Sequence, residues 1–186
     1  MKIYLNDDIE HFDWQAALPL LSEQRKAQCL QFRYEQGRKT CAAAYLLLCE
    51  ALRKEHGIEE QPVFEYGEHG KPLLAGHPDI HFNLSHCREA AICVVSHEPV
   101  GVDIESIRPL KESLARYVMN DEEMAQILHA ENPALEFTRL WTRKEAVVKR
   151  SGHGISDHMK HVLEALPFEL QTVVNTEKNY VYSITL

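Results

Sequence analysis

Three acidic residues are spaced so that they could bind one cation. Asp103 and Glu105 lie two residues apart in the segment 100–105, which alternates like a β-strand, and side chains two apart project from the same face of a strand. Glu145 lies in the segment 141–145, which has the periodicity of a helix. Proteins bind the hard cation Mg²⁺ with a few carboxylates, water and phosphate oxygens. The residues therefore predict a magnesium site where a strand meets a helix.

Other side chains offer positive charge or hydrogen-bond donors to a phosphate group. Lys71 stands on a Gly-Pro turn, and Lys149 follows Glu145 by one helical turn. Ser85 and His86 stand at the end of a predicted strand. Each of these short motifs is also common as an ordinary turn or strand end. Only their occurrence together with the carboxylates predicts a phosphate-bearing ligand beside the metal.

The elements expected to position these residues are both strands and helices. Strands are predicted at 2–5, 62–66, 81–85, 90–96 and 100–105, with closing strands at 168–170 and 180–186. Helices are predicted from Ser22 to about His56 with a bend or break near Gly37, at 111–117, at 121–130, and from Asn132-Pro133 onward. This order indicates an α+β protein of two similar halves, residues 1–98 and 99–186, that share an interface.

Lys144 is an unusual residue in the last of these helices. It falls within an apolar stripe that includes Phe137, Leu140, Trp141 and Val148. A lysine at such a position either extends its amine past the edge of the core or pairs with a buried partner.

The motifs in this order and spacing resemble the Sfp-type 4′-phosphopantetheinyl transferases. The resemblance covers about residues 22 to 154. It rests on Gly70-Lys71-Pro72, Phe82-Asn83-Leu84-Ser85-His86, Gly101-Val102-Asp103-Ile104-Glu105 and Trp141-Thr142-Arg143-Lys144-Glu145-Ala146-Val147-Val148-Lys149. Similarity to this family implies transfer of the phosphopantetheine group of coenzyme A to a serine of an apo acyl or peptidyl carrier protein, with release of adenosine 3′,5′-bisphosphate.

The resemblance also implies roles for individual residues. The magnesium ligands would be Asp103, Glu105 and Glu145, and the catalytic residues Glu145 and Lys149. The coenzyme A contacts would be Arg38, Lys71, Ser85, His86, Asp103 and Lys149, with Ser85 and His86 at the 3′-phosphate and diphosphate end and with Arg25 and Lys39 as alternatives to Arg38. Because a metal ion weakens a bound carboxylate as a base, Glu145 is predicted as a ligand first and as the base second.

The overall composition limits the kinds of partner. The chain has 186 residues and a net charge of −8, which argues against nucleic acid as a partner. Two basic islands, 22–39 with net charge +3 and 139–150 with net charge +4, indicate a small polyanion or an acidic protein surface instead. Carrier proteins are usually acidic around the modified serine, so two docking surfaces are predicted, the basic island 139–150 and the group Arg108, Lys111 and Arg116.

Location and assembly are predicted from features of the same sequence. A signal peptide and a membrane-spanning stretch are not expected, and five cysteines with no CxxC pair are expected to be free thiols, so a cytoplasmic protein is predicted. Because the chain carries both halves of the family pattern, the resemblance implies a pseudo-twofold monomer with the active site between the halves.

Two other functions remain as alternatives. The first is a catalytically inactive coenzyme A or nucleotide-binding module of the same fold. The second is another magnesium-dependent phosphotransferase, but the sequence lacks the GxxxxGK[ST] loop that would hold a triphosphate. The sequence does not indicate which carrier protein is served.

Overall fold

The computed structural model describes residues 1–67, 69–154 and 157–186. Its first part contains β1 (Lys2–Asn6), α1 (Trp14–Ala17), η1 (Leu18–Leu20), α2 (Glu23–Gln31), α3 (Glu35–His56), β2 (Phe64–Tyr66), β3 (Pro72–Leu74), β4 (His81–His86) and β5 (Ala91–Ser96). Its second part contains β6 (Val102–Ser106), α4 (Glu112–Val118), α5 (Asp121–His129), α6 (Pro133–Ser151), η2 (Asp157–His161), β7 (Leu170–Asn175) and β8 (Tyr180–Thr185).

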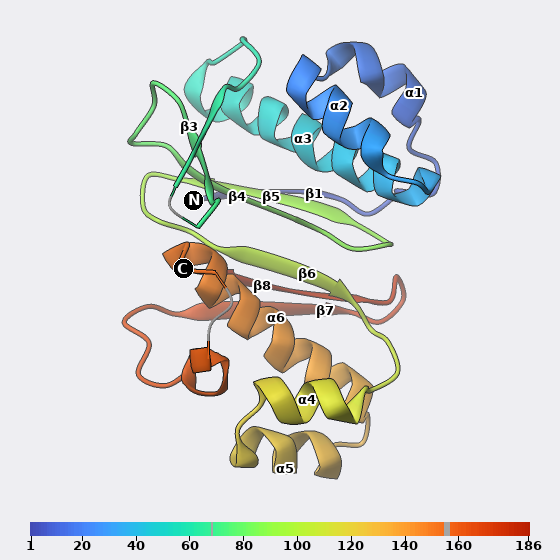
Figure 1. Ribbon diagram of the computed structural model, residues 1–186, viewed down its shortest axis with the longest axis vertical. Coiled ribbons are helices and arrows are strands. Elements are labelled where there is room, and N and C mark those ends of the chain that lie inside the picture. The colour runs from blue at the N-terminus through green and yellow to red at the C-terminus, as the bar shows by residue number, and fades with distance from the viewer. Residues whose placement is uncertain (68, 155–156) are drawn as a thin grey trace.

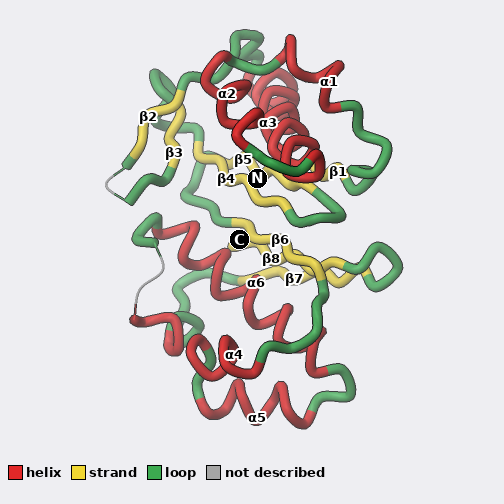
Figure 2. Tube along the Cα trace, turned by 45° about the vertical axis from the view of Figure 1, so that its right-hand side comes forward, coloured by secondary structure: helices red, strands yellow, loops and turns green. Residues whose placement is uncertain are grey.

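The strands form two antiparallel three-stranded sheets of similar plan. The first has the order β1-β5-β4 and the second the order β6-β8-β7, while β2 and β3 form a separate hairpin. Helix α3 covers the outer face of the first sheet, and α6 lies against the second sheet (Figures 1 and 2). The predicted α+β fold class is confirmed.

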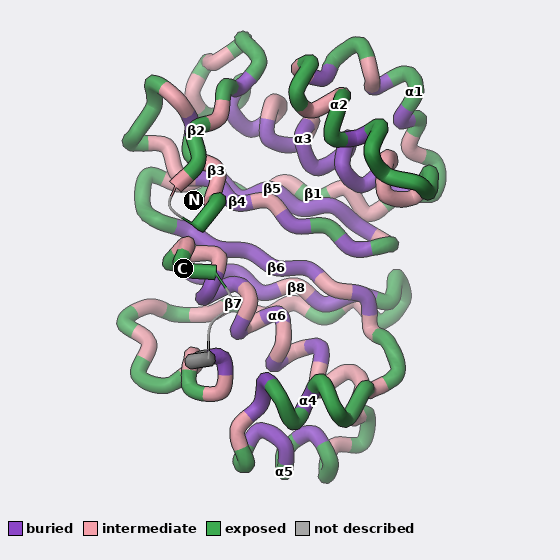
Figure 3. The backbone as a smooth tube through the Cα atoms, in the orientation of Figure 1, coloured by how far each residue is buried: buried purple, intermediate pink, exposed green. Residues whose placement is uncertain are grey.

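The inner faces of the two sheets pack against each other. Ile92 and Val94 of β5 contact Val102 and Ile104 of β6 and Ile184 of β8 in one buried cluster. Figure 3 shows this junction as a continuous buried band across β5, β6 and β8. Burial of apolar surface stabilises a contact by about 25 cal/mol per Å², so this buried band stabilises the packing of the two sheets. Polar groups at its edge are therefore held on a rigid base.

The predicted long helix from Ser22 to His56 is wrong in one respect. Helix α2 ends at Gln31 and α3 begins at Glu35. The helical stretch is therefore interrupted at residues 32–34, and Gly37 lies inside α3. The ring of Phe32 lies against Gly37, where an added Cβ would be only 2.4 Å from the Phe32 Cδ1 atom. The Phe32 ring packs back on this glycine where the chain turns, a contact that helical periodicity does not reveal.

Helix α6 begins where its sequence predicts. Asn132 caps it by accepting a hydrogen bond from the Leu135 amide, Pro133 occupies its first turn, and Gly152 ends it in the left-handed conformation with φ of 74°. No described helix combines the length and the apolar character needed to cross a lipid bilayer.

Lys144 of α6 takes the second of its two predicted options. It is fully buried, and its Nζ pairs with Glu123 Oε1 at 2.9 Å. It also donates to the carbonyl oxygens of Met159 at 2.7 Å and Lys160 at 3.2 Å. All three protons of the ammonium group have acceptors, which makes its burial tolerable and ties α5 and η2 to α6.

Candidate active site

A polar cluster lies at the edge where β4, β6 and α6 meet. Lys149 Nζ of α6 pairs with Asp103 Oδ1 of β6 at 2.6 Å and donates to Ser85 Oγ of β4 at 3.0 Å. Ser85 Oγ in turn donates to the same Asp103 oxygen at 2.9 Å. Asp103 is only 3% exposed, and electrostatic interactions are stronger away from water. The positive charge of Lys149 therefore balances the charge of this carboxylate effectively.

The close approach of α6 to β6 depends on Gly101. A Cβ at this position would lie 2.0 Å from the Ala146 carbonyl oxygen and 2.5 Å from the Arg150 amide nitrogen. Only a residue without a side chain allows the backbone of α6 to lie so close to the start of β6. Because Glu145 and Lys149 occupy the same stretch of α6, the glycine sets their distance from Asp103.

Two further carboxyl groups lie beside this cluster. Burial, followed by the nearby charge of Asp103, raises the pKa of Glu145 to about 7. Burial and then Asp103 also raise the pKa of Glu105, while its hydrogen bond with the Trp141 side chain opposes the shift. The acids that the sequence singles out are thus close enough to disfavour one another's ionisation, which is the situation that a bound cation relieves.

The carboxylate oxygens of this site suit a divalent cation, although the side chains do not surround one common position. Asp103 Oδ2 and Glu145 Oε1 are buried and have no hydrogen-bond partner among the described residues. Buried oxygens without a partner are costly unless something binds them. Within the described part of the chain, however, no three His, Cys, Asp or Glu side chains converge as a formed metal site. The unpartnered carboxylate oxygens are the kind of ligand that a divalent cation binds.

A hollow of about 280 Å³ opens beside the cluster on the side of β4 and the β2–β3 hairpin. Its lining includes Lys71, Asn83, Glu145, Lys149, Gly152 and Gly154. Lys71 reaches across from the hairpin and donates to the Arg150 carbonyl oxygen near the end of α6 at 2.8 Å. Burial and then Arg150 lower the pKa of this lysine. Two lysines and one acid thus border a hollow that both halves of the sequence contribute to.

Comparison with known families accounts for nearly the whole chain. Residues 9–99 match the model of the 4′-phosphopantetheinyl transferase N-terminal domain, and residues 99–182 match the model of the 4′-phosphopantetheinyl transferase superfamily. The chain belongs to this superfamily. The family and the transferase class predicted from the motifs are therefore confirmed.

Individual phosphopantetheinyl transferases show the same relationship. The chain is 24% identical to 4′-phosphopantetheinyl transferase Sfp of Bacillus subtilis strain 168, over 83% of this chain and 70% of that protein. It is 32% identical to 4′-phosphopantetheinyl transferase psf-1 of Bacillus pumilus, over 74% of this chain and 60% of that protein. It is 43% identical to 4′-phosphopantetheinyl transferase AcpT of Salmonella typhi, over 62% of this chain and 59% of that protein.

The residues predicted to bind the nucleotide end of the transferase's substrate are not all brought together. Partial desolvation, followed by the charges of Lys149 and Arg25, lowers the pKa of His86 at the exposed end of β4. Arg38 instead lies over the ring of Trp14 at 5.1 Å and donates to the Phe32 carbonyl oxygen at 3.0 Å. Arg25, one of the two alternatives, lies over the rings of Tyr45 at 5.2 Å and Phe64 at 5.7 Å, and its charge acts on His86.

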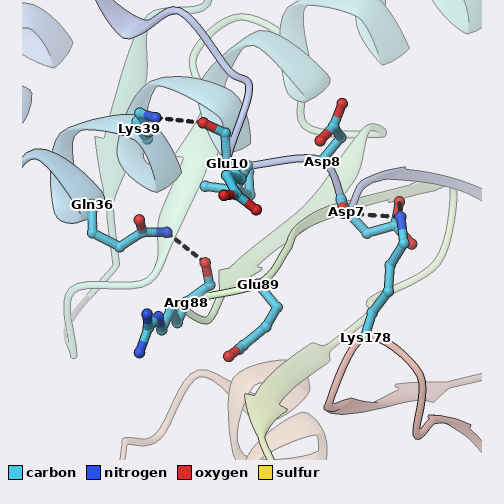
Figure 4. Close-up of a pocket in the computed structure, with 9 residues that line it drawn as sticks. Asp7, Asp8, Glu10, Gln36, Lys39, Arg88, Glu89 and Lys178 are labelled. Carbon is cyan, nitrogen blue, oxygen red and sulfur yellow. Dashed lines mark hydrogen bonds and ion pairs between the residues drawn. The ribbon is translucent and has the colours of Figure 1, made fainter.

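A second hollow, of about 530 Å³, lies away from the cluster (Figure 4). It contains Lys39, the remaining alternative, whose Nζ donates to the Glu10 carbonyl oxygen at 2.6 Å. At its other side Lys178 of the β7–β8 turn pairs with Asp7 at 2.8 Å. Because Asp7 follows β1 and Lys178 belongs to the second sheet, this ion pair joins the two halves of the transferase.

Sequence reasoning gave no role to two residues that shape the site. Asn83 belongs to the predicted motif, yet its position on the hollow and its hydrogen bond to the Val102 amide at 3.0 Å were not anticipated. Gly101 was likewise only part of a motif. A signal for Asn83 did exist, because it lies two residues from Ser85 and therefore on the same face of β4. The tight contact at Gly101 depends on a helix distant in sequence and leaves no local signal.

Proposed function

We propose that this protein transfers the 4′-phosphopantetheine group of coenzyme A to a serine of an apo acyl or peptidyl carrier protein. The serine hydroxyl loses its proton to a base, for which Glu145 is the candidate among the side chains of the cluster. The serine oxygen forms a bond to the phosphorus that carries the pantetheine, and the bond from that phosphorus to the bridging oxygen of the diphosphate breaks. The leaving group is adenosine 3′,5′-bisphosphate. The observation that supports this proposal is the cluster of Ser85, Asp103 and Lys149 with Glu145 beside it, in a chain of this superfamily.

Magnesium would be bound by Asp103, Glu105 and Glu145. Their support as ligands is the pair of buried oxygens without partners and the raised pKa values of the two glutamates. When bound, the ion would neutralise charge on the diphosphate oxygens as the bond to the leaving group breaks. We assign Glu145 to the metal first, since an ion that keeps this carboxylate deprotonated also weakens it as the base for the serine.

The lysines would stabilise the charge that develops during transfer. Lys149 lies beside the carboxylates and Lys71 lies across the 280 Å³ hollow, so a diphosphate between them would meet a positive charge on each side. We place the nucleotide end of coenzyme A toward His86 and Arg25, because the charge of Arg25 acts on His86 whereas Arg38 donates to the Phe32 carbonyl oxygen. Asp103 would reach the coenzyme through the metal.

The carrier protein would dock on the other side of Glu105. A hollow of about 240 Å³ there has Leu114, Phe137 and Trp141 in its lining and Arg108 and Lys111 beside them. An apolar floor with basic residues suits the acidic helical surface of a carrier protein. Arg116 does not line this hollow, and it pairs with Glu112 at 2.5 Å. We therefore narrow the predicted docking surface to Arg108 and Lys111.

We treat residues 1–98 and 99–186 as halves that together make one working unit, and we propose a monomer. The support is that the 280 Å³ hollow takes Lys71 from the first half and Lys149 from the second. All five cysteines are free thiols, which supports the reducing cytoplasm as the location.

The deciding experiment is the intact mass of an apo carrier protein after incubation with this protein, coenzyme A and Mg²⁺. We expect a gain of roughly 340 Da, the mass of one phosphopantetheine group. The gain should vanish without metal and with Glu145→Gln. If several carrier types show no gain while coenzyme A still binds, the chain is the inactive binding module that the sequence left as an alternative.

A further inference from the structure

The two halves meet along a line where side chains take the place of backbone pairing. Strand β4 is at the edge of the first sheet and β6 at the edge of the second. The Val102 amide donates to Asn83 Oδ1 at 3.0 Å, and the Ile104 amide donates to Ser85 Oγ at 3.2 Å. The two donor amides are two residues apart on β6, and the two acceptor side chains are two residues apart on β4. The side chains of β4 therefore satisfy the amides of β6 that point away from its own sheet.

The hydroxyl group of Ser85 is fully used in this arrangement. A serine hydroxyl has one proton to donate and two lone pairs that accept. Its proton goes to Asp103 Oδ1, and its lone pairs accept from Lys149 Nζ and from the Ile104 amide. Ser85 is also only 7% exposed. A phosphate oxygen can only accept a hydrogen bond from this group, and its single proton is already committed to a carboxylate.

Asp103 is held by one oxygen and free at the other. Oδ1 receives both Ser85 and Lys149, whereas Oδ2 is buried without a partner among the described residues. Two donors on one oxygen fix the rotation of the carboxylate. The remaining oxygen is then presented in a constant direction.

We infer that Ser85 is a positioning residue for Asp103 and Lys149 and not a contact to the phosphates of coenzyme A. This inference rests on the proposed function, since it concerns how the same site binds metal and coenzyme. It differs from the role that the family resemblance implies for Ser85. It also gives Asn83 a distinct task, because Asn83 joins the same two strands without touching Asp103.

The test measures coenzyme A binding by titration calorimetry in EDTA and again in saturating Mg²⁺. The variants are Ser85→Ala, the nearly isosteric Ser85→Cys in case the first does not fold, and Asn83→Ala as the matched control. A positioning residue acts through Asp103, so its loss should reduce the gain in affinity that Mg²⁺ provides. A phosphate contact should matter with or without the metal.

We expect both Ser85 variants to bind coenzyme A in EDTA within about threefold of the wild type. The Mg²⁺-dependent gain in affinity should fall at least about tenfold, the effect of removing a hydrogen bond to a buried carboxylate. Asn83→Ala should lower the melting temperature. Because Asn83 lines the hollow without touching Asp103, any change in coenzyme A affinity should be the same in EDTA and in Mg²⁺, so that the gain provided by Mg²⁺ keeps its wild-type value.

Two results would overturn the inference. One is a loss of about tenfold already in EDTA with the Mg²⁺ response intact, which would make Ser85 a phosphate contact. The other is an equal loss of the Mg²⁺ response in Asn83→Ala, which would make it a general property of the strand junction. Failure of the proposed function is recognised separately, because the wild type would then modify no carrier protein, whether or not it binds coenzyme A.

Discussion

Gly101→Ala should separate the two sides of the active site while changing none of its functional groups. The new Cβ would lie 2.0 Å from the Ala146 carbonyl oxygen, where real contacts of a Cβ essentially never fall below 3.0 Å. The obstructing atoms belong to the helix backbone and cannot rotate away, so α6 must move by about 1 Å. The Lys149–Asp103 pair, now 2.6 Å apart, lies on the two elements that would separate.

A displacement of this size has a calculable effect on rate. Misplacing catalytic groups by about 1 Å costs on the order of 100-fold in rate, and overpacking costs about 1–3 kcal/mol of stability. We therefore expect kcat for carrier-protein modification to fall about 100-fold in a variant that still folds at 25 °C. Glu145 moves with the helix, so added Mg²⁺ should restore little of the rate.

The assay is steady-state transfer from coenzyme A to an apo carrier protein, with thermal unfolding followed on the same samples. Gly67→Ala is the matched control, because its φ is not in the left-handed region and its Cβ would meet only the Lys71 carbonyl oxygen, at 3.7 Å. A folded Gly101→Ala protein with kcat within threefold of the control would show that the α6–β6 distance does not govern the rate.

Further perturbations test other contacts of the structure. Lys144→Met should cost about 3 kcal/mol in urea unfolding because it leaves Glu123 charged and buried, and adding Glu123→Gln should recover part of this loss; no recovery would mean that the ion pair is not the cause. Lys178 holds the pKa of Asp7 below its ordinary value, so the pair stabilises the fold at neutral pH and this contribution is lost as the pH falls through the folded-state pKa. Asp7→Asn should therefore destabilise by about 1 kcal/mol or less at pH 7, with the difference from wild type vanishing in acid; a constant difference would contradict this. Lys111→Glu should raise KM for the carrier protein severalfold and leave coenzyme A binding unchanged, and an unaltered KM would exclude Lys111 from the docking surface.

Much of the site could be predicted because its residues obey local rules. The two-residue spacing of Asp103 and Glu105 places both on one face of β6, and the cap at Asn132-Pro133 fixes where α6 begins. The spacing of Glu145 and Lys149 along that helix then brings both toward β6. These features depend only on the periods of strands and helices, which is why they are readable from a single sequence.

The features that could not be predicted depend on contacts that the periods of helices and strands do not reveal. The break between α2 and α3 follows from the Phe32 ring on Gly37, and the fit of α6 follows from Gly101 facing Ala146. Strand β3 begins at Pro72, a residue typical of a turn, and is a short strand paired only with β2. The partners of Arg38 were equally unreadable, because nothing in its own helix indicates that it faces Trp14.

Because side chains of β4 bind amides of β6, hydrogen exchange at two amides should measure how often the two halves separate. The Val102 and Ile104 amides are bonded to Asn83 and Ser85 and not to a strand of their own sheet. Their hydrogen exchange should therefore follow opening of the two halves, whereas neighbouring amides in the β6–β8 ladder follow unfolding of the second sheet. Exchange at these two positions would show how often the halves part in solution, and whether a ligand bound between them holds them together.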